Sequence, residues 1–220
     1  AATAGELRLV NDVDLETYVG AVIAREYGFD DREGARAMAV IIRTYTLSSL
    51  GKFGADYDLV DHTMSQVYQG VEGVAPAFFE AARRTQGEVL TYRGNLIDAV
   101  YFSSSGGHTA DNETVWQSSA VPYLRGRPDP YDESPDSRWT ARIAARRVHE
   151  ALGRRYGGSV SGVQIESRSA DGRVHWMRLE GARRDRILGQ DFRMMTIEVF
   201  GGRVLRSTLF DMRRDGSDYV

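Results

Sequence analysis

The stretch "DLETYVGAVIAREYG", residues 14–28, predicts the helix on which the rest of the fold is built. Asp14 is a typical N-cap residue, and Gly28 suits the left-handed position that ends a helix. At about 100° per residue, Glu26 lies about 20° from Leu15, near the middle of the apolar stripe. The pattern therefore directs a carboxylate toward the interior or toward the wall of a cleft.

Glu26 at this position has two interpretations. A carboxylate in the last turn can reach solvent or cap the next helix, and the periodicity alone favours this explanation. Alternatively, Glu26 is a general acid in an apolar pocket, where desolvation favours the protonated form of a carboxyl group. Arg25 falls outside the apolar stripe and is expected to matter much less.

The remaining pattern mixes helices and strands and predicts an α+β fold of mixed helices and antiparallel strands. Helices are predicted over 30–51, 75–87, 142–157 and 183–195. Strands are predicted over 66–68 and 196–216 and in hairpins around 93–95 and 171–172. Residues 121–137 hold four of the five prolines, so we expect a single domain over 1–220 with two lobes, a lobe boundary near 125–138 and a substrate cleft.

Composition excludes several function classes. The net charge of −3 gives no support for binding nucleic acid, and the arginines of "ARIAARR" and "GRRYG" are interpreted as solvated helix faces. A chain with no cysteine has no disulfides, thiolate metal sites or cysteine nucleophiles. The four histidines have no metal-ligand spacing, and His108 and Asp111 lack a nucleophile elbow beside them. The sequence shows neither a signal peptide nor an apolar run of membrane-spanning length.

Ordered motifs across residues 15–132 resemble the SpoIID family, named for stage II sporulation protein D and including the amidase enhancer LytB. After "LETYVGAVIAREYG" come "EGARAMAVIIRTYT", "SQVYQG", "TQGEVLTYRGNLIDAVYFSSSGGHT" and "VPYLRGRPDPYD". Several motifs in the family's order are far more specific than any one of them.

The resemblance implies a lytic transglycosylase that acts without a cofactor on peptidoglycan glycan strands, particularly strands stripped of their stem peptides. The family's catalytic glutamate corresponds to Glu26. One carboxyl group would protonate the glycosidic oxygen and then activate the C6 hydroxyl of N-acetylmuramic acid, giving a 1,6-anhydro product. Candidates for lining the sugar cleft are Arg43, Tyr45, Gln66, Tyr68, Tyr101, Ser103, Gly106 and Gly107.

This sequence departs from the family pattern in three places. Residues 60–65 stand where some members have zinc-binding cysteine and histidine, and Ser105 replaces a frequent cysteine, so we predict no structural zinc. The family's glycine- and histidine-containing C-terminal motif is expected to be absent, because the sequence stops at Val220 before it. The alternative function is a non-catalytic, glycan-binding modifier of a cell-wall amidase. Either function implies an extracytoplasmic location, in the cell envelope or secreted.

Overall fold

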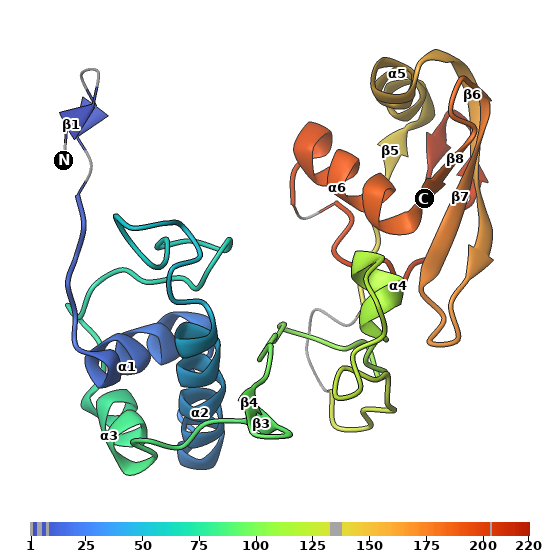
Figure 1. Ribbon diagram of the computed structural model, residues 1–220. Coiled ribbons are helices and arrows are strands. Elements are labelled where there is room, and N and C mark those ends of the chain that lie inside the picture. The colour runs from blue at the N-terminus through green and yellow to red at the C-terminus, as the bar shows by residue number, and fades with distance from the viewer. Residues whose placement is uncertain (1, 4–5, 8, 133–137, 203) are drawn as a thin grey trace. The chain divides into compact units, whose positions relative to one another are not determined.

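The computed structural model describes residues 2–3, 6–7, 9–132, 138–202 and 204–220, with helices and antiparallel strands that confirm the α+β prediction (Figure 1). The chain divides into two compact units, Ala1–Tyr101 and Phe102–Val220. The predicted lobe boundary near 125–138 falls partly on residues 133–137, outside the described residues. That boundary, the single domain over 1–220 and the cleft stay predictions.

The first unit is built from three helices and two short hairpins. The helices are α1 (Leu15–Glu26), α2 (Arg32–Ser48) and α3 (Pro76–Arg84). The hairpins pair β1 (Ala2–Thr3) with β2 (Glu6–Leu7) and β3 (Thr91–Tyr92) with β4 (Asn95–Leu96). Arg93 and Gly94 connect β3 to β4 with positive φ angles of 51° and 83°, as a two-residue hairpin turn requires.

Helix α1 begins and ends where the sequence predicts. Asp14 Oδ1 accepts hydrogen bonds from the backbone N–H groups of Glu16 and Thr17, at 3.0 and 3.1 Å. Gly28 has a φ of 70° and donates its N–H to the Ile23 carbonyl at 3.0 Å.

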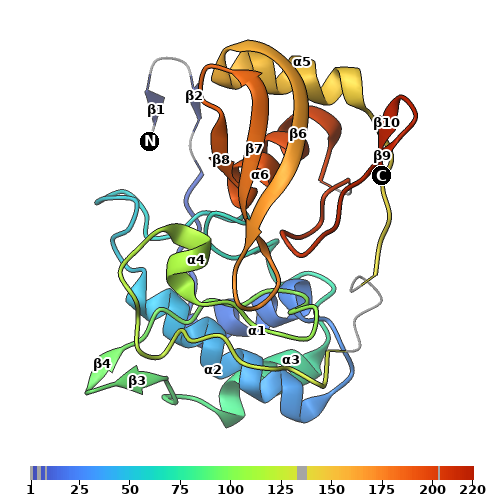
Figure 2. The same cartoon turned by 90° about the vertical axis from the view of Figure 1, so that its right-hand side faces the viewer.

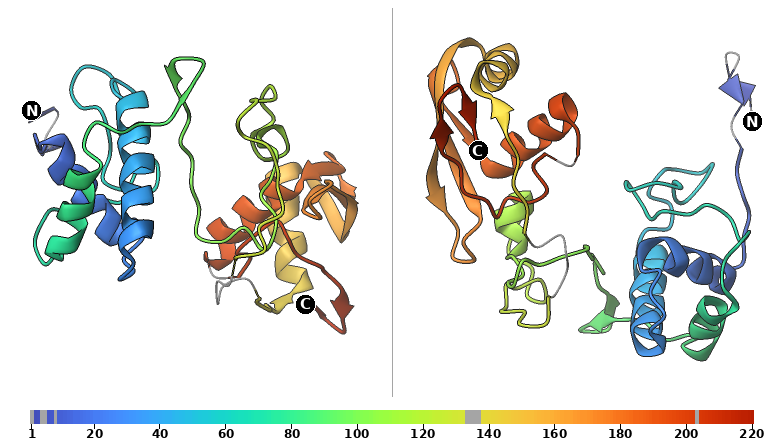
Figure 3. Two further views of the ribbon diagram at one scale, coloured as in Figure 1. Left: turned by 90° about the horizontal axis from the view of Figure 1, so that it is seen from below. Right: turned by 180° about the vertical axis from the view of Figure 1, so that it is seen from behind.

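The core of the first unit lies where α1 packs against α2 and α3 (Figures 2 and 3). A Cβ atom at Gly20 would lie 2.4 Å from Phe79 Cδ1, so this glycine permits the close approach of α1 and α3. The buried residues of this core are Tyr18, Val19, Val22, Ile23, Ala35, Ala39, Ile42, Ala81 and Ala82.

The second unit is an antiparallel sheet with two helices on one face (Figures 1 and 3). The sheet has the order β6 (Gly158–Arg168), β7 (Val174–Ala182), β8 (Arg186–Leu188), and the helices are α5 (Ala145–Tyr156) and α6 (Gly189–Phe200). A smaller sheet has the order β5 (Ile143–Ala144), β10 (Asp218–Tyr219), β9 (Arg214–Asp215), and α4 covers Asn112–Trp116. Leu152, Met177, Ile187 and Met195 are among the core residues between the sheet and its helices.

Two strand predictions are wrong. Residues 66–68 are extended but pair with no strand among the described residues. Residues 196–200 belong to α6, where Thr196 is buried and donates its hydroxyl to the Phe192 carbonyl at 2.8 Å. Packing of this helix face in the core outweighs the strand propensity of its β-branched residues.

Candidate functional site

Glu26 is the last residue of α1 and is partly buried, whereas its neighbour Arg25 is exposed, as the helical periodicity predicts. Glu26 Oε1 accepts a hydrogen bond of 2.7 Å from the backbone N–H of Val67. The segment 66–68 thus fixes one carboxylate oxygen of Glu26.

Gln66 is fully buried beside this carboxylate and is the centre of a hydrogen-bond network. Its Oε1 accepts from the hydroxyls of Thr46 at 2.9 Å and of Tyr18 at 3.4 Å. Its Nε2 donates to the Tyr101 hydroxyl oxygen at 3.3 Å. Because the amide oxygen and the amide nitrogen of Gln66 both form hydrogen bonds, these bonds fix the orientation of the amide and of the three hydroxyl groups around it.

Two tyrosines next to Glu26 remain protonated at neutral pH. Burial raises the pKa of Tyr101, with a further contribution from the Glu26 carboxylate. Burial also raises the pKa of Tyr18, with smaller contributions from Tyr45 and Glu26. These groups therefore act as neutral hydrogen-bonding hydroxyls and not as bases.

Tyr68 and Tyr45 complete the aromatic surroundings. The Tyr68 ring stacks on Tyr18, with centroids 5.2 Å apart, and its hydroxyl accepts from Asn11 Nδ2 at 2.9 Å. The Tyr45 hydroxyl accepts from Lys52 Nζ at 3.3 Å. The first unit thus brings Glu26 together with aromatic and amide side chains that suit the faces and hydroxyl edges of a sugar.

Arg43 has a different position from the one expected of a cleft residue. Its side chain is 1% exposed and forms a two-point ion pair with Glu16, with Nε–Oε1 at 2.9 Å and Nη2–Oε2 at 2.5 Å. Further bonds reach the carbonyl oxygens of Ala82 and Glu88, at 2.9 and 3.1 Å. Arg43 therefore supports the site by joining α1, α2 and the end of α3, and it does not line a cleft.

Three predicted sugar-binding residues lie in the second unit. Ser103 is exposed, and Gly106 and Gly107 have φ angles of 67° and 95° that favour glycine. The Gly106 N–H donates to Asp132 Oδ2 at 2.6 Å, and the Gly107 N–H donates to Ser105 Oγ at 3.1 Å. The structure thus brings this loop together with Asp132, which lies 26 residues after Gly106 and ends the motif "VPYLRGRPDPYD".

The serines of this loop bind the same acidic motif. Ser104 Oγ donates to Asp132 Oδ2 at 2.7 Å, and Ser105 Oγ lies 2.9 Å from Asp129 Oδ2. Arg173 donates to the carbonyl oxygens of Ser105 and His108, at 2.7 and 2.9 Å. Sequence reasoning missed these contacts, although "SSSGG" and "DPYD" were both visible as motifs.

Within residues 9–132, 138–202 and 204–220, no group of three histidine, aspartate or glutamate side chains is placed to hold a metal ion. Residues 60–65 form a loop. Over the described part of the chain, no helix is both long enough and apolar enough to cross a membrane.

The buried tyrosine hydroxyls predict a loss of stability at alkaline pH. A tyrosine pKa raised above its ordinary value of 10.0 stabilises the folded state below pH 10, and this contribution is lost as the pH rises through the folded-state pKa. Tyr101→Phe is therefore expected to flatten the fall in the free energy of unfolding between pH 9 and 11, measured by urea titration. Tyr131, 88% exposed, supplies the control Tyr131→Phe, whose slope should match the wild type. An unchanged slope in Tyr101→Phe would contradict the assignment.

Comparison with known proteins finds a family model that matches part of the chain and relatives that cover between about half and nearly all of it. Residues 3–92 match the sequence model of the family described as SpoIID, stage II sporulation protein. Stage II sporulation protein D of Bacillus amyloliquefaciens is 30% identical over 94% of this chain, and the chain spans 62% of that protein. The amidase enhancer of Bacillus subtilis is 36% identical over 53% of the chain and 15% of its own length. An uncharacterized protein of Brachyspira hyodysenteriae is 33% identical over 66% of this chain and 40% of its own length.

Proposed function

Since this chain carries a SpoIID-family domain and is a homologue of stage II sporulation protein D, we propose that it is a lytic transglycosylase of peptidoglycan. The observation that carries the proposal is the Glu26 carboxyl group, held by the Val67 N–H at the end of α1 among neutral tyrosine hydroxyls. The substrate is the glycan strand, particularly one without stem peptides.

Glu26 acts in turn as acid and base. Because Oε1 accepts the Val67 N–H, we assign proton transfer to Oε2. Oε2 protonates the oxygen between N-acetylmuramic acid and N-acetylglucosamine as the bond from that oxygen to C1 breaks. The C6 hydroxyl then attacks C1 and returns its proton to Glu26, which closes the 1,6-anhydro ring. This internal hydroxyl replaces the water molecule that glycosidases use, so a second catalytic carboxylate is unnecessary.

The other polar groups of the first unit orient the sugar and the acid. The Tyr101 oxygen accepts from Gln66, which leaves its hydrogen for another acceptor, and Glu26 lies close enough to raise the pKa of Tyr101. Tyr68 and Tyr45 offer aromatic faces to sugar rings. We keep these four residues as substrate-binding candidates, with Ser103, Gly106 and Gly107 as separate candidates on the second unit.

A second candidate function is that of a non-catalytic glycan-binding protein that modifies a cell-wall amidase. The relative named amidase enhancer supports it, because its name describes an effect on another enzyme. Both functions place the protein outside the cytoplasm, where peptidoglycan is found.

Digestion of stem-peptide-free glycan strands, with products identified by mass spectrometry, separates these functions. We expect the wild-type protein to generate 1,6-anhydro-N-acetylmuramic acid ends. Ordinary reducing ends would overturn the internal attack, because they require water as the nucleophile. Retention of the strands on the protein without cleavage would favour the amidase-modifying function.

A further inference from the structure

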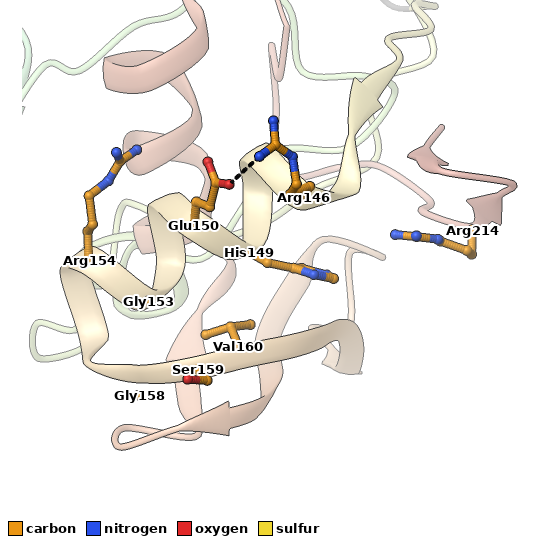
Figure 4. Close-up of a pocket in the computed structure, with 9 residues that line it drawn as sticks. All are labelled: Arg146, His149, Glu150, Gly153, Arg154, Gly158, Ser159, Val160 and Arg214. Atoms are coloured by element: carbon orange, nitrogen blue, oxygen red, sulfur yellow. Dashed lines mark ion pairs between the residues drawn. The ribbon is translucent and has the colours of Figure 1, made fainter.

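An open groove of about 630 Å³ lies in the second unit, where α5 faces the start of β6 (Figure 4). Gly153 leaves the helix surface bare there, because it has no side chain to fill the groove. Arg146, Glu150 and Arg154 project from one side of α5, and His149 extends from the other side toward Arg214 (Figure 4). The residues that line this groove lie outside the sequence motifs that suggest carbohydrate cleavage.

The lining of the groove has an excess of positive charge, with three arginines against one glutamate. Among the described residues, the Arg154 guanidinium makes no hydrogen bond or ion pair. Arg214 uses its Nε to donate to the Gly216 carbonyl at 2.8 Å, which leaves both terminal nitrogens for a ligand. Arg146 pairs with Glu150 at 3.2 Å, but its side chain is 85% exposed, so this pair is weak.

His149 contributes a neutral imidazole to the same lining. Burial lowers the pKa of His149, and the nearby Arg214 lowers it further. Its Nε2 is 2.9 Å from the Tyr219 hydroxyl, which fixes the ring against β10. The groove therefore combines flexible cations with one fixed polar ring, on a chain whose overall charge is negative.

The spacing of the cations favours an elongated ligand. Arg146 and Arg154 are two turns apart on α5, which places their backbones about 12 Å apart along the helix axis. A single small anion cannot contact both sites at once. Glu150 stands between them and repels an anion there, so the complementary ligand carries its charges at intervals.

We propose that this groove binds a linear phosphodiester polymer. Such a polymer carries its charges within the backbone and at intervals, as the groove requires. Each phosphodiester shares one negative charge between two non-bridging oxygens. Arginines from different elements, α5 and β9, can bind these oxygens, and arginine suits phosphate through paired N–H donors. The site is separate from Glu26, so the protein holds the polymer independently of glycan cleavage.

Binding of poly(glycerol phosphate) to the purified chain, measured by isothermal titration calorimetry, tests the proposal. Arg154→Ala and Arg214→Ala are each expected to weaken binding about tenfold, since each removes charge-assisted hydrogen bonds. Glu150→Gln is expected to strengthen it, because the variant removes the one acidic side chain. Arg127→Ala is the matched control, since it removes an equally exposed arginine outside the groove and should leave the affinity unchanged.

Four further measurements make the outcome decisive. Inorganic phosphate is expected to bind at least tenfold more weakly than the polymer, and binding should weaken as salt is added. Glu26→Gln should bind the polymer like the wild type, which separates this proposal from the catalytic one. The proposal is overturned if the polymer fails to bind at low salt, if Arg127→Ala loses as much affinity as Arg154→Ala, or if polyglutamate binds equally well.

Discussion

Replacing Glu26 by glutamine is expected to slow the cleavage of stem-peptide-free glycan strands by about 10²- to 10⁴-fold, the usual contribution of a general acid or base. Glutamine keeps the size of the side chain and an oxygen that can accept the Val67 N–H, which lies 2.7 Å from Glu26 Oε1. It has no proton to give to the leaving oxygen. The loss should therefore appear in kcat with little change in the thermal midpoint of unfolding.

Arg25→Gln is the matched control for this measurement. Arg25 precedes Glu26 on α1 but is exposed, so its replacement should leave both cleavage and stability close to those of the wild type. Rates are compared by quantifying 1,6-anhydro ends over time. A Glu26→Gln variant that cleaves as fast as Arg25→Gln would remove Glu26 from the mechanism.

Replacing Arg43 by methionine is expected to destabilise the first unit by about 3–5 kcal/mol, the usual cost of leaving a buried charge without its partner. The Glu16 side chain is 19% exposed and would lose its ion pair with Arg43, in which Nη2 lies 2.5 Å from Oε2. The bonds from Arg43 to the carbonyl oxygens of Ala82 and Glu88 would be lost as well, although Ala82 would still accept from the Thr85 N–H. Urea unfolding followed by circular dichroism measures the change in the free energy of unfolding.

Arg36→Met provides the comparison within the same helix. Arg36 pairs with Glu33 at 2.7 Å, but the two side chains are 38% and 80% exposed, and exposed pairs contribute little. The loss in the free energy of unfolding of Arg43→Lys should lie between those of Arg43→Met and Arg36→Met. Lysine keeps the charge but cannot form the two-point ion pair. Equal losses in Arg43→Met and Arg36→Met would show that burial of the Glu16 pair has no energetic importance.

The local features of the fold are visible in the sequence. Asp14 and Gly28 mark the ends of α1 because an N-cap and a left-handed glycine act within a few residues. The turn at Arg93 and Gly94 follows from the same kind of short-range rule. Helical periodicity also gives the partial burial of Glu26, since it depends only on the angle between residues.

The partners of the site residues depend on contacts between distant segments, which no periodicity reveals. Val67 lies 41 positions from Glu26, and it meets the carboxylate only after segment 66–68 has folded against α1. Arg43 and Glu16 are 27 positions apart, so the motif containing Arg43 gave no indication of a buried pair. The tertiary structure is therefore needed to show that Glu26 lies in the candidate site and that Glu16 pairs with a buried arginine.

The partners of Arg43 also set a lower limit on the length of a fragment that can fold cooperatively. Its hydrogen bonds extend from Glu16 to the Glu88 carbonyl, so no fragment shorter than residues 16–88 contains every group that the guanidinium needs. Helices α1 and α2 alone would keep the Glu16 pair but would leave the buried guanidinium without its bonds to the Ala82 and Glu88 carbonyl oxygens. The minimal autonomous fragment must therefore include α3 and the residues after it, and residues 3–92, the part that matches the family, contain this fragment in full.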